Sequence, residues 1–372
     1  MDFIDACIAG VLNPIVEAAD AIPKNRKGRE KLRDGINKLI EHNHYDTFIA
    51  FCTKDLYDFI NLYGWDPCIE CAEFNRMDML TYSHDTLCNK TKCVNDVIEF
   101  AAKNNNFEMM EYITSFEEIA EIISEYSSDK DEACTSAAKY NRMEMFTYLH
   151  QKGFQMSKLV CMYAAENNNL AMLQYFRENG CEWDVETIEY ACKGGHFQLV
   201  MYLHENGCPW DQRSCIEASR QGHLNILTYL HENGCPWTAG TISAACNSDD
   251  PENIECLEYA YNHGCEMDHW AAIKCGLFGS SKCLDFILSK NAPLTIFAIS
   301  EATKQGNLEM VIKLRHHGCP WDARVTYWAR KEGHNAIYDY AIANNCPLPG
   351  EDYRYAYCAI SDYYNVHPEE FI

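Results

Sequence analysis

Four cysteines in the first quarter of the chain have a spacing that could bind a metal ion. Cys68 and Cys71 are separated by two residues, and Cys88 and Cys93 follow further along. Four thiolates at such spacings are typical of a tetrahedral zinc site. Against this, Cys71 takes the position that Ala101 holds later in the chain, where the pattern points into an apolar core. Because a free cysteine packs well as a small buried side chain, we expect no metal ion and no cofactor.

Histidines also recur at a regular position in the sequence. His150, His204 and His231 hold the same place in their repeats, and His316 lies one position later in its own. Helices that pack side by side lie roughly 10 Å apart, which is too far for neighbouring copies to share one ion at bond lengths of about 2 Å. We therefore expect an exposed polar position that is inherited with the repeat.

Other signatures of catalysis are weak. Gly276–Lys282 faintly resembles a phosphate-binding loop but lacks the required spacing and a preceding strand; in register it is the break between two helices. The chain shows no nucleophile elbow, no dinucleotide fingerprint and no acid–base pair outside the repeats. We expect no catalytic residues and no enzymatic activity, and a zinc- or cysteine-dependent enzyme is the least favoured alternative.

The elements that would position any site follow an internal repeat. The stretch Tyr202–Asp211, YLHENGCPWD, returns nearly letter for letter as Tyr229–Thr238. Its glycine, or an asparagine in the same place, recurs every 27 residues, with one spacing of 30 where Ser248–Asp250 are inserted; these positions are Gly153, Gly180, Gly207, Gly234, Gly264, Asn291, Gly318 and Asn345. A fixed period in this range indicates stacked structural repeats.

One repeat, Asp184–Trp210, shows what each copy should form. Asp184 is of a type that caps helix N-termini, and the same place holds Asp211, Thr238, Asp268, Thr295 and Asp322. Ala191 and Cys192 share one face of a first helix. A second helix follows a Gly-His break and ends at Gly207, where a left-handed residue favours glycine and, next, asparagine. Each repeat is therefore predicted to be helix, break, helix and short loop.

The run Ala191–Val200, ACKGGHFQLV, followed by Gly207 and Cys208, resembles the ankyrin repeat: two small residues, Gly-His, an apolar helix, and glycine with a small residue. The ankyrin period is 33 residues, and Glu186–Glu189 stands where Thr-Pro-Leu-His would open the repeat. The six residues by which 27 falls short of 33 belong to the β-hairpin loop of ankyrins. The resemblance implies an all-α, ankyrin-like solenoid of stacked helix pairs with reduced or absent β-hairpins.

The 27-residue period with its Gly-Cys-Pro-Trp step is also similar to repeat proteins that are abundant in giant viruses of the mimivirus type. The resemblance covers residues 130–348 well and residues 45–130 weakly. It implies protein–protein binding and, in the viral case, a host protein as the partner.

Composition excludes several classes of function. The net charge of −24 opposes the basic footprint of a nucleic-acid binder. Asp2 and Asp5 stand where a secretory signal needs positive charge, and no apolar run approaches the roughly 20 residues that span a bilayer. The 21 cysteines are odd in number, and successive copies of one position lie beyond disulfide reach. We expect an intracellular protein with neither a nucleic acid nor a membrane as partner.

The pattern divides the chain into four segments and about eleven repeats: a helical cap (1–43), degenerate repeats (44–136), regular repeats (137–348), and a capping helix with a tail (349–372). Phe3, Cys7, Ile8 and Val11 predict one amphipathic helix in the cap. The basic stretch Lys24–Arg33 is a solvated helix face in the interpretation that we favour, and a docking segment for an acidic partner or a membrane surface in the other.

The positions that vary between repeats are where a partner would be recognised. They lie on the first helix, opposite its buried face, and in ankyrin-like stacks these helices line the concave side. The row mixes aromatic residues with both signs of charge, as protein interfaces do: Glu189, Tyr190, Lys193, Arg213, Glu217, Arg220, Trp270, Lys274, Phe297, Glu301 and Lys304. We predict a monomeric scaffold that binds protein through this row. The alternative is self-assembly, for example within a virion.

Overall fold

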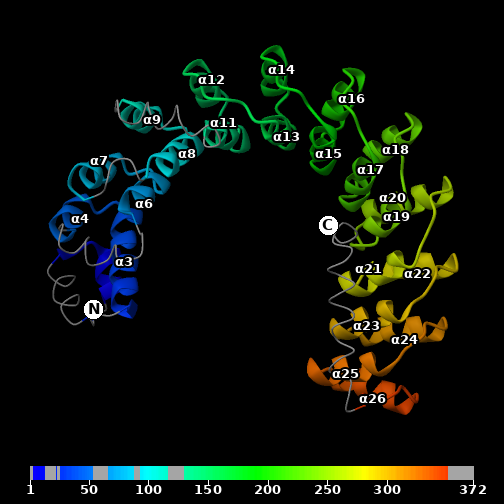
Figure 1. Cartoon of the computed structure of the whole chain (residues 1–372). Helices are drawn as coiled ribbons and strands as arrows, with labels where there is room; N and C mark the ends of the chain where they lie inside the picture. Colours follow the sequence, from blue (N-terminus) through cyan, green and yellow to red (C-terminus); the bar gives the residue numbers. More distant parts are fainter. Residues whose placement is uncertain are drawn as a thin grey trace. The chain divides into compact units, whose positions relative to one another are not determined.

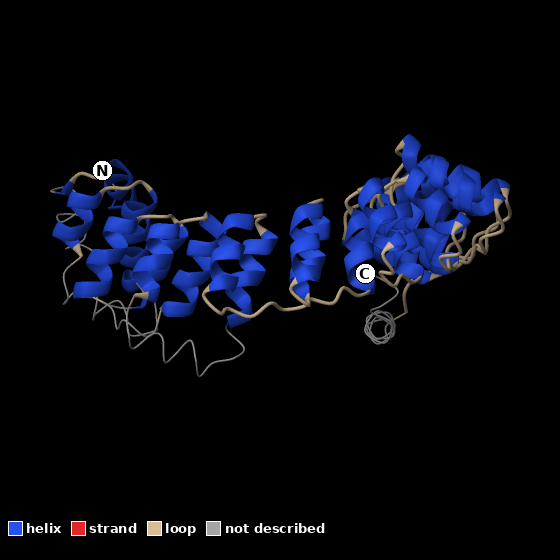
Figure 2. Ribbon diagram, turned by 90° about the horizontal axis from the view of Figure 1, so that it is seen from above, coloured by secondary structure: helices blue, strands red, loops and turns tan. Residues whose placement is uncertain are grey.

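The computed structural model describes residues 3–12, 22, 26–52, 66–87, 93–115 and 130–350. Every regular element in these ranges is a helix (Figure 2), which confirms the predicted all-α solenoid of helix pairs. No helix in the same ranges is long and apolar enough to cross a bilayer. The predicted C-terminal capping helix lies outside the described residues, and the four segment boundaries stay predictions.

The chain separates into two compact halves, Met1–Glu182 and Trp183–Ile372. Phe3 and Cys7 are buried in the N-terminal half as predicted. Ile8 and Val11 are 40% and 46% exposed, and Val11 lies beyond the end of the first helix at Ala9. The helices of this half are α1 (Phe3–Ala9), α3 (Arg26–Glu41), α4 (Tyr45–Phe51), α6 (Pro67–Glu73), α7 (Met77–Thr86), α8 (Val94–Asn104), α9 (Phe107–Thr114), α11 (Lys130–Lys139), α12 (Met143–Gln151), α13 (Leu159–Glu166) and α14 (Leu170–Glu178).

In the C-terminal half, the first helices of successive repeats stack in one column and the second helices in another (Figure 1). The first column is α15 (Val185–Lys193), α17 (Gln212–Arg220), α19 (Ala239–Ala245), α21 (Trp270–Phe278), α23 (Ile296–Lys304) and α25 (Ala323–Lys331). The second column is α16 (Phe197–Glu205), α18 (Leu224–Glu232), α20 (Pro251–Asn262), α22 (Ser281–Ser289), α24 (Leu308–His316) and α26 (Asn335–Ala343).

Most repeats of the C-terminal half contain two residues in the left-handed backbone region, whereas the α19–α20 repeat has one, Gly264. The predicted one ends the second helix, with a φ of 78° at Gly207 and 56° at Asn291. The other was not anticipated and lies in the break between the two helices, with a φ of 74° at Gly195. A Cβ at Gly207 would meet nothing within 4 Å, whereas one at Gly195 would stand 2.7 Å from the His223 ring. At Gly195 the glycine therefore provides space as well as backbone conformation, whereas Asn141 and Asn168 hold the same place in earlier repeats.

The predicted N-caps are correct where the residue is aspartate. A carboxylate oxygen of Asp184 accepts a hydrogen bond of 3.1 Å from the Glu186 amide, and the Asp322 carboxylate accepts one of 2.9 Å from the Arg324 amide. The prediction is wrong at Thr238 and Thr295, whose side chains make no capping hydrogen bond. Their backbones are extended like that of Asp184, so they start the helix without satisfying an amide.

The first helices approach one another closely because their facing residues are small. Ala191 and Cys192 are fully buried. Gly276 lies inside α21, where an added Cβ would stand 2.4 Å from the carbonyl oxygen of Ala298 in α23. This corrects the placement of Gly276 in the break, which falls instead at Gly279, with a φ of 76°. Gly276 thus serves helix packing.

The cysteine after the helix-ending glycine has a repeated structural role. The Cys208 thiol donates to the carbonyl oxygen of Asp184 at 3.4 Å, and Cys319 donates to Thr295 at 3.2 Å. The bond ties the end of a repeat to the residue that starts its first helix. The expectation that cysteines are too far apart for disulfides applies only to cysteines at the same position of successive repeats. Cys161 and Cys181 hold different repeat positions, and their Sγ atoms lie 3.4 Å apart.

Candidate functional site

The predicted partner-binding residues lie on one face of the C-terminal half, which we call the first-helix face. They come from four first helices: Glu189, Tyr190 and Lys193 from α15, Arg213, Glu217 and Arg220 from α17, Trp270 and Lys274 from α21, and Phe297, Glu301 and Lys304 from α23. None of these helices brings together an acid, a base and a nucleophile of the kind that a catalytic site requires.

Residues from α17, α19 and α21 enclose a hollow of about 490 Å³ on this face. Its floor is α19, which offers only small side chains there, such as Gly240, Ser243 and Ala244. Its walls carry larger side chains from the flanking helices: Arg213, Ile216 and Arg220 on one side, and Trp270, Lys274 and Phe278 on the other. The hollow thus forms because α19 has small side chains at its variable positions, whereas α17 and α21 on either side have large ones.

The wall residue Phe278 was missed by the sequence argument. It lies four residues, or about one helical turn, after Lys274 in α21. Its side chain is 53% exposed, although Cys275 and Gly276 just before it are buried. The sequence signal was a bulky aromatic at the last position of a first helix, directly before the Gly279 break. Together with Trp270 and Ile216 it makes this part of the hollow apolar.

Ion pairs hold the α17 side of the hollow. Arg213 lies 3.2 Å from a Glu189 carboxylate oxygen and 3.1 Å from one of Asp211. Burial raises the pKa of Glu189, and Arg213 lowers it in part. Arg220 lies 3.4 Å from Glu217 on the same helix. Both arginines are therefore held in place before any partner arrives.

On the opposite wall, Lys274 is a cation in an unfavourable environment. Burial lowers its pKa, and the positive charge of Arg220 lowers it further. Its Nζ lies 5.8 Å from the centre of the Phe278 ring, a contact that compensates a cation only weakly. Three cationic side chains thus line the hollow, Arg213, Arg220 and Lys274, and both arginines are paired with carboxylates.

The predicted residues on α15 and α23 lie outside the hollow. They contact residues of their own helix or of the next first helix. Lys193 lies 4.9 Å from the Tyr190 ring centre, and Phe297 has the Arg324 guanidinium 5.0 Å from its ring centre. Glu301 is 4% exposed and lies 2.6 Å from Lys304. Because so little of Glu301 reaches the surface, it offers a partner almost no contact area.

The repeated histidines have a structural role that the sequence argument did not foresee. A hydrogen bond joins the histidine Nδ1 to the tyrosine hydroxyl of the next repeat in four pairs: His84–Tyr112 at 3.3 Å, His150–Tyr175 at 2.8 Å, His204–Tyr229 at 2.8 Å and His231–Tyr259 at 2.9 Å. His204 also stacks on Trp210 with ring centres 3.9 Å apart. His150, His204 and His231 are half-buried connectors between repeats, so the prediction of an exposed position is wrong for these three. It is correct for His316, which is exposed.

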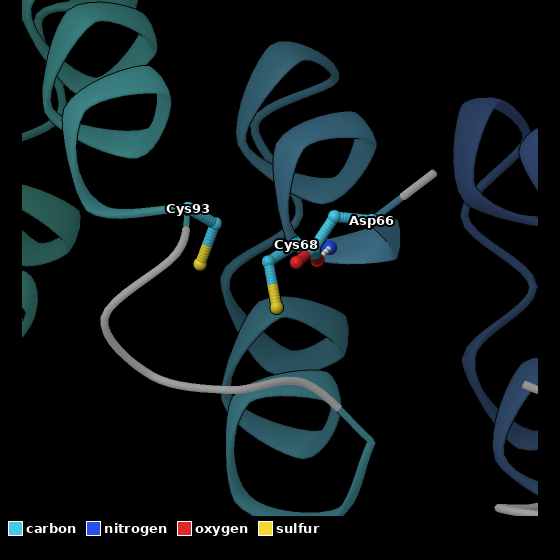
Figure 3. Close-up of side chains that lie close together, drawn as sticks. All are labelled: Asp66, Cys68 and Cys93. Carbon is cyan, nitrogen blue, oxygen red and sulfur yellow. Dashed lines mark hydrogen bonds between the residues drawn. The ribbon is translucent and has the colours of Figure 1, made fainter. Parts of the chain in front are cut away.

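The predicted cysteine quartet does not come together as such. Cys71 has its Sγ 3.9 Å from the Ser83 hydroxyl oxygen, and Cys88 lies outside the described residues. Cys68 and Cys93 instead meet at Asp66 (Figure 3). The Cys68 thiol, and after it His84, lower the pKa of Cys93 to about 6, although burial and the charge of Asp66 raise it.

Comparison with known proteins identifies the repeat type. Residues 161–241 match the sequence model described as ankyrin repeats (3 copies). No curated protein matches the chain. Among solved structures, the human ASB11 ankyrin repeat domain is 19% identical with a TM-score of 0.35, over 43% of this chain and 84% of that one.

A second solved structure, the pentatricopeptide repeat protein PPR10 in complex with an 18-nt psaJ RNA element, is 13% identical with a TM-score of 0.41. The match covers 95% of this chain and 54% of that one, so the chain spans about half of its length. At these TM-scores neither structure bears on function, RNA binding included. The sequence match and the helix pairs together show that the described residues form an all-helical solenoid of ankyrin-like repeats.

Proposed function

We propose that the chain is a non-catalytic scaffold that binds a protein partner through the first-helix face, with the hollow between α17 and α21 as its centre. The observation that carries this proposal is that the variable positions of three neighbouring first helices, α17, α19 and α21, line one hollow. Positions that serve the fold are nearly constant from repeat to repeat, whereas these differ in size and charge. Solenoids present such extended surfaces to their partners.

The chemistry of the hollow favours a partner segment with an acidic side chain beside a bulky apolar one. Arg220 and Lys274 provide the positive charge, and a carboxylate between them would offset the desolvation that lowers the pKa of Lys274. Trp270 and the exposed Phe278 provide an apolar wall for the neighbouring side chain. Aromatic and cationic side chains of this kind dominate binding energy at protein interfaces.

The test is capture of a partner from cell lysate by the full chain, followed by affinity measurement with the purified partner. Arg220→Glu/Lys274→Glu reverses both charges of the hollow. Lys282→Glu/Lys290→Glu makes the same change of net charge on exposed residues of and after α22, and serves as the control. We expect the first pair to weaken binding by at least tenfold and the second to leave it within about twofold.

Equal loss in both variants would indicate nonspecific attraction, and loss in neither would place the partner elsewhere on the chain. Self-assembly, the alternative, predicts that the chain captures only itself and that its size in solution rises with concentration. A viral source, a host protein as partner and an intracellular location rest on the resemblance to giant-virus repeats and on composition; the match to ankyrin repeats bears on none of them.

A further inference from the structure

Three potential metal ligands converge in the N-terminal half, away from the first-helix face. Asp66 precedes α6, Cys68 lies in its first turn, and Cys93 directly precedes α8. Their exposed fractions are 3%, 0% and 0%. One carboxylate oxygen and the two Sγ atoms all lie within 4.8 Å of one another (Figure 3). The site therefore brings together two consecutive repeats at a buried point.

The local structure explains why these side chains are held there. One oxygen of Asp66 accepts a hydrogen bond of 2.9 Å from the Cys68 amide and so caps α6. This bond fixes the carboxylate beside the Cys68 side chain.

A fourth donor lies beside the cluster. His84 of α7 is 1% exposed, and after the Cys68 thiol its ring lowers the pKa of Cys93. It lies beside the three ligand atoms but outside the group in which all of them are within 4.8 Å of one another. Its Nδ1 lies 3.3 Å from the Tyr112 hydroxyl oxygen. A metal-bound histidine characteristically has its other ring nitrogen hydrogen-bonded in this way, which orients the ring.

We propose that Asp66, Cys68 and Cys93 bind a zinc ion, with His84 as the fourth ligand, and that the ion joins the α6–α7 repeat to α8. Zinc bonds to sulfur are about 2.3 Å long, so a tetrahedral site sets its sulfur atoms roughly 3.8 Å apart. The three ligand atoms, all within 4.8 Å of one another, need to move closer by no more than about 1 Å.

The donor set also selects the type of ion. Thiolates favour zinc over magnesium or calcium, which prefer oxygen ligands. On binding, each thiol loses its proton to the solvent, so that the two thiolates balance the charge of the ion and the carboxylate leaves the site with one net negative charge. The site differs from the four-cysteine site that the spacing suggests, because Cys71 faces Ser83 and takes no part.

The test is zinc content of the full chain, purified after growth in zinc-supplemented medium and measured by inductively coupled plasma mass spectrometry. We expect about one zinc ion per chain, lost in Cys68→Ser and in Cys93→Ser. Cys71→Ser is the matched control, since it removes a buried thiol from the same helix as Cys68 and should keep the ion. Zinc-free wild-type protein, or equal retention in Cys93→Ser and Cys71→Ser, overturns the proposal.

A second measurement covers the case in which a ligand variant fails to fold. Metal-free wild-type protein is titrated with cobalt(II), which absorbs visible light in a tetrahedral thiolate site. We expect saturation at one equivalent, displacement by zinc, and a higher Tm with zinc than without it, because an ion that binds only the folded chain stabilises it. No thiolate–cobalt absorption and no change in Tm would exclude the site.

Discussion

The hydroxyl oxygen of Tyr229 lies 2.8 Å from Nδ1 of His204, and this contact joins α18 to α16, the second helix of the preceding repeat. The same pair recurs in the next repeat as His231 and Tyr259. Burial raises the pKa of Tyr229, as expected for a hydroxyl that is shielded from water. Adjacent repeats are thus linked by polar contacts as well as by their apolar core.

Removing this hydroxyl should weaken the stack. Tyr229→Phe leaves the Nδ1 of His204 without its partner, and we expect a loss of about 1 kcal/mol in the free energy of unfolding. Tyr340→Phe is the control, because Tyr340 holds the same repeat position but has no hydroxyl hydrogen bond within the described residues. Urea denaturation followed by circular dichroism measures the free energy of unfolding of both variants. Equal losses would show that the hydrogen bond to His204 is not the cause.

The two left-handed glycines of a repeat should differ in their tolerance of substitution. Gly207→Val adds backbone strain alone and should cost about 1–2 kcal/mol. Gly195→Val should cost more, since its Cβ would also stand 2.7 Å from the His223 ring. Gly207→Asn should be the mildest, because Asn291 already holds the equivalent place. Denaturant midpoints that rank the three variants otherwise would contradict the packing argument.

Asp249, in the three-residue insertion, should stabilise the start of α22. Its carboxylate accepts hydrogen bonds from the amides of Ser281 at 2.8 Å, Lys282 at 2.8 Å and Cys283 at 3.1 Å, at the start of α22 in the following repeat. Loss of an N-cap side chain costs about 1 kcal/mol, which we expect for Asp249→Ala. The neighbouring Asp250→Ala is the control, because Asp250 makes no capping bond to α20; similar thermal shifts for both would refute the assignment.

Stability should fall in mild acid. Burial, and then the nearby His263, lower the pKa of His231, so the folded chain holds this imidazole neutral. A histidine whose folded-state pKa lies below its unfolded value of about 6.5 contributes stability above that value. The contribution is lost as the pH falls through the lower, folded-state pKa.

The free energy of unfolding, measured by urea titration at a series of pH values from 7.5 to 5, should therefore decrease less steeply in His231→Gln than in the wild type. The exposed His317 provides the control, and His317→Gln should follow the wild-type curve. A wild-type curve that is flat, or parallel to that of His231→Gln, would show that His231 titrates alike in both states.

The sequence allowed the repeat, its helices and its aspartate caps to be predicted because these depend on residues close together in the chain. Asp184 and Glu186 are two positions apart, and the helix-ending glycines need only their own backbone conformation. The partner of His204 is 25 residues away, in another repeat, so its identity depends on how repeats stack. Local spacing therefore assigned the histidines to the surface.

The same limit applies to the two candidate sites. The variable row was found from the sequence, but the hollow exists because α19 carries small residues between two helices with large ones, which is a property of three repeats together. The Cys-x-x-Cys spacing indicated Cys71 as a ligand, yet the residue that meets Cys68 is Cys93, 25 positions along the chain. Asp66 was overlooked because a carboxylate two residues before Cys68 does not belong to the cysteine spacing that was searched for.

The buried thiols that bind the start of each repeat also provide a set of probes, one in almost every repeat of the C-terminal half. Burial raises the pKa of Cys265, Cys319 and Cys346 to about 11 each, so an alkylating reagent reaches them only when a repeat transiently opens. In a linear array, opening spreads inward from the ends. The order in which these cysteines become labelled would therefore record, repeat by repeat, how the solenoid comes apart.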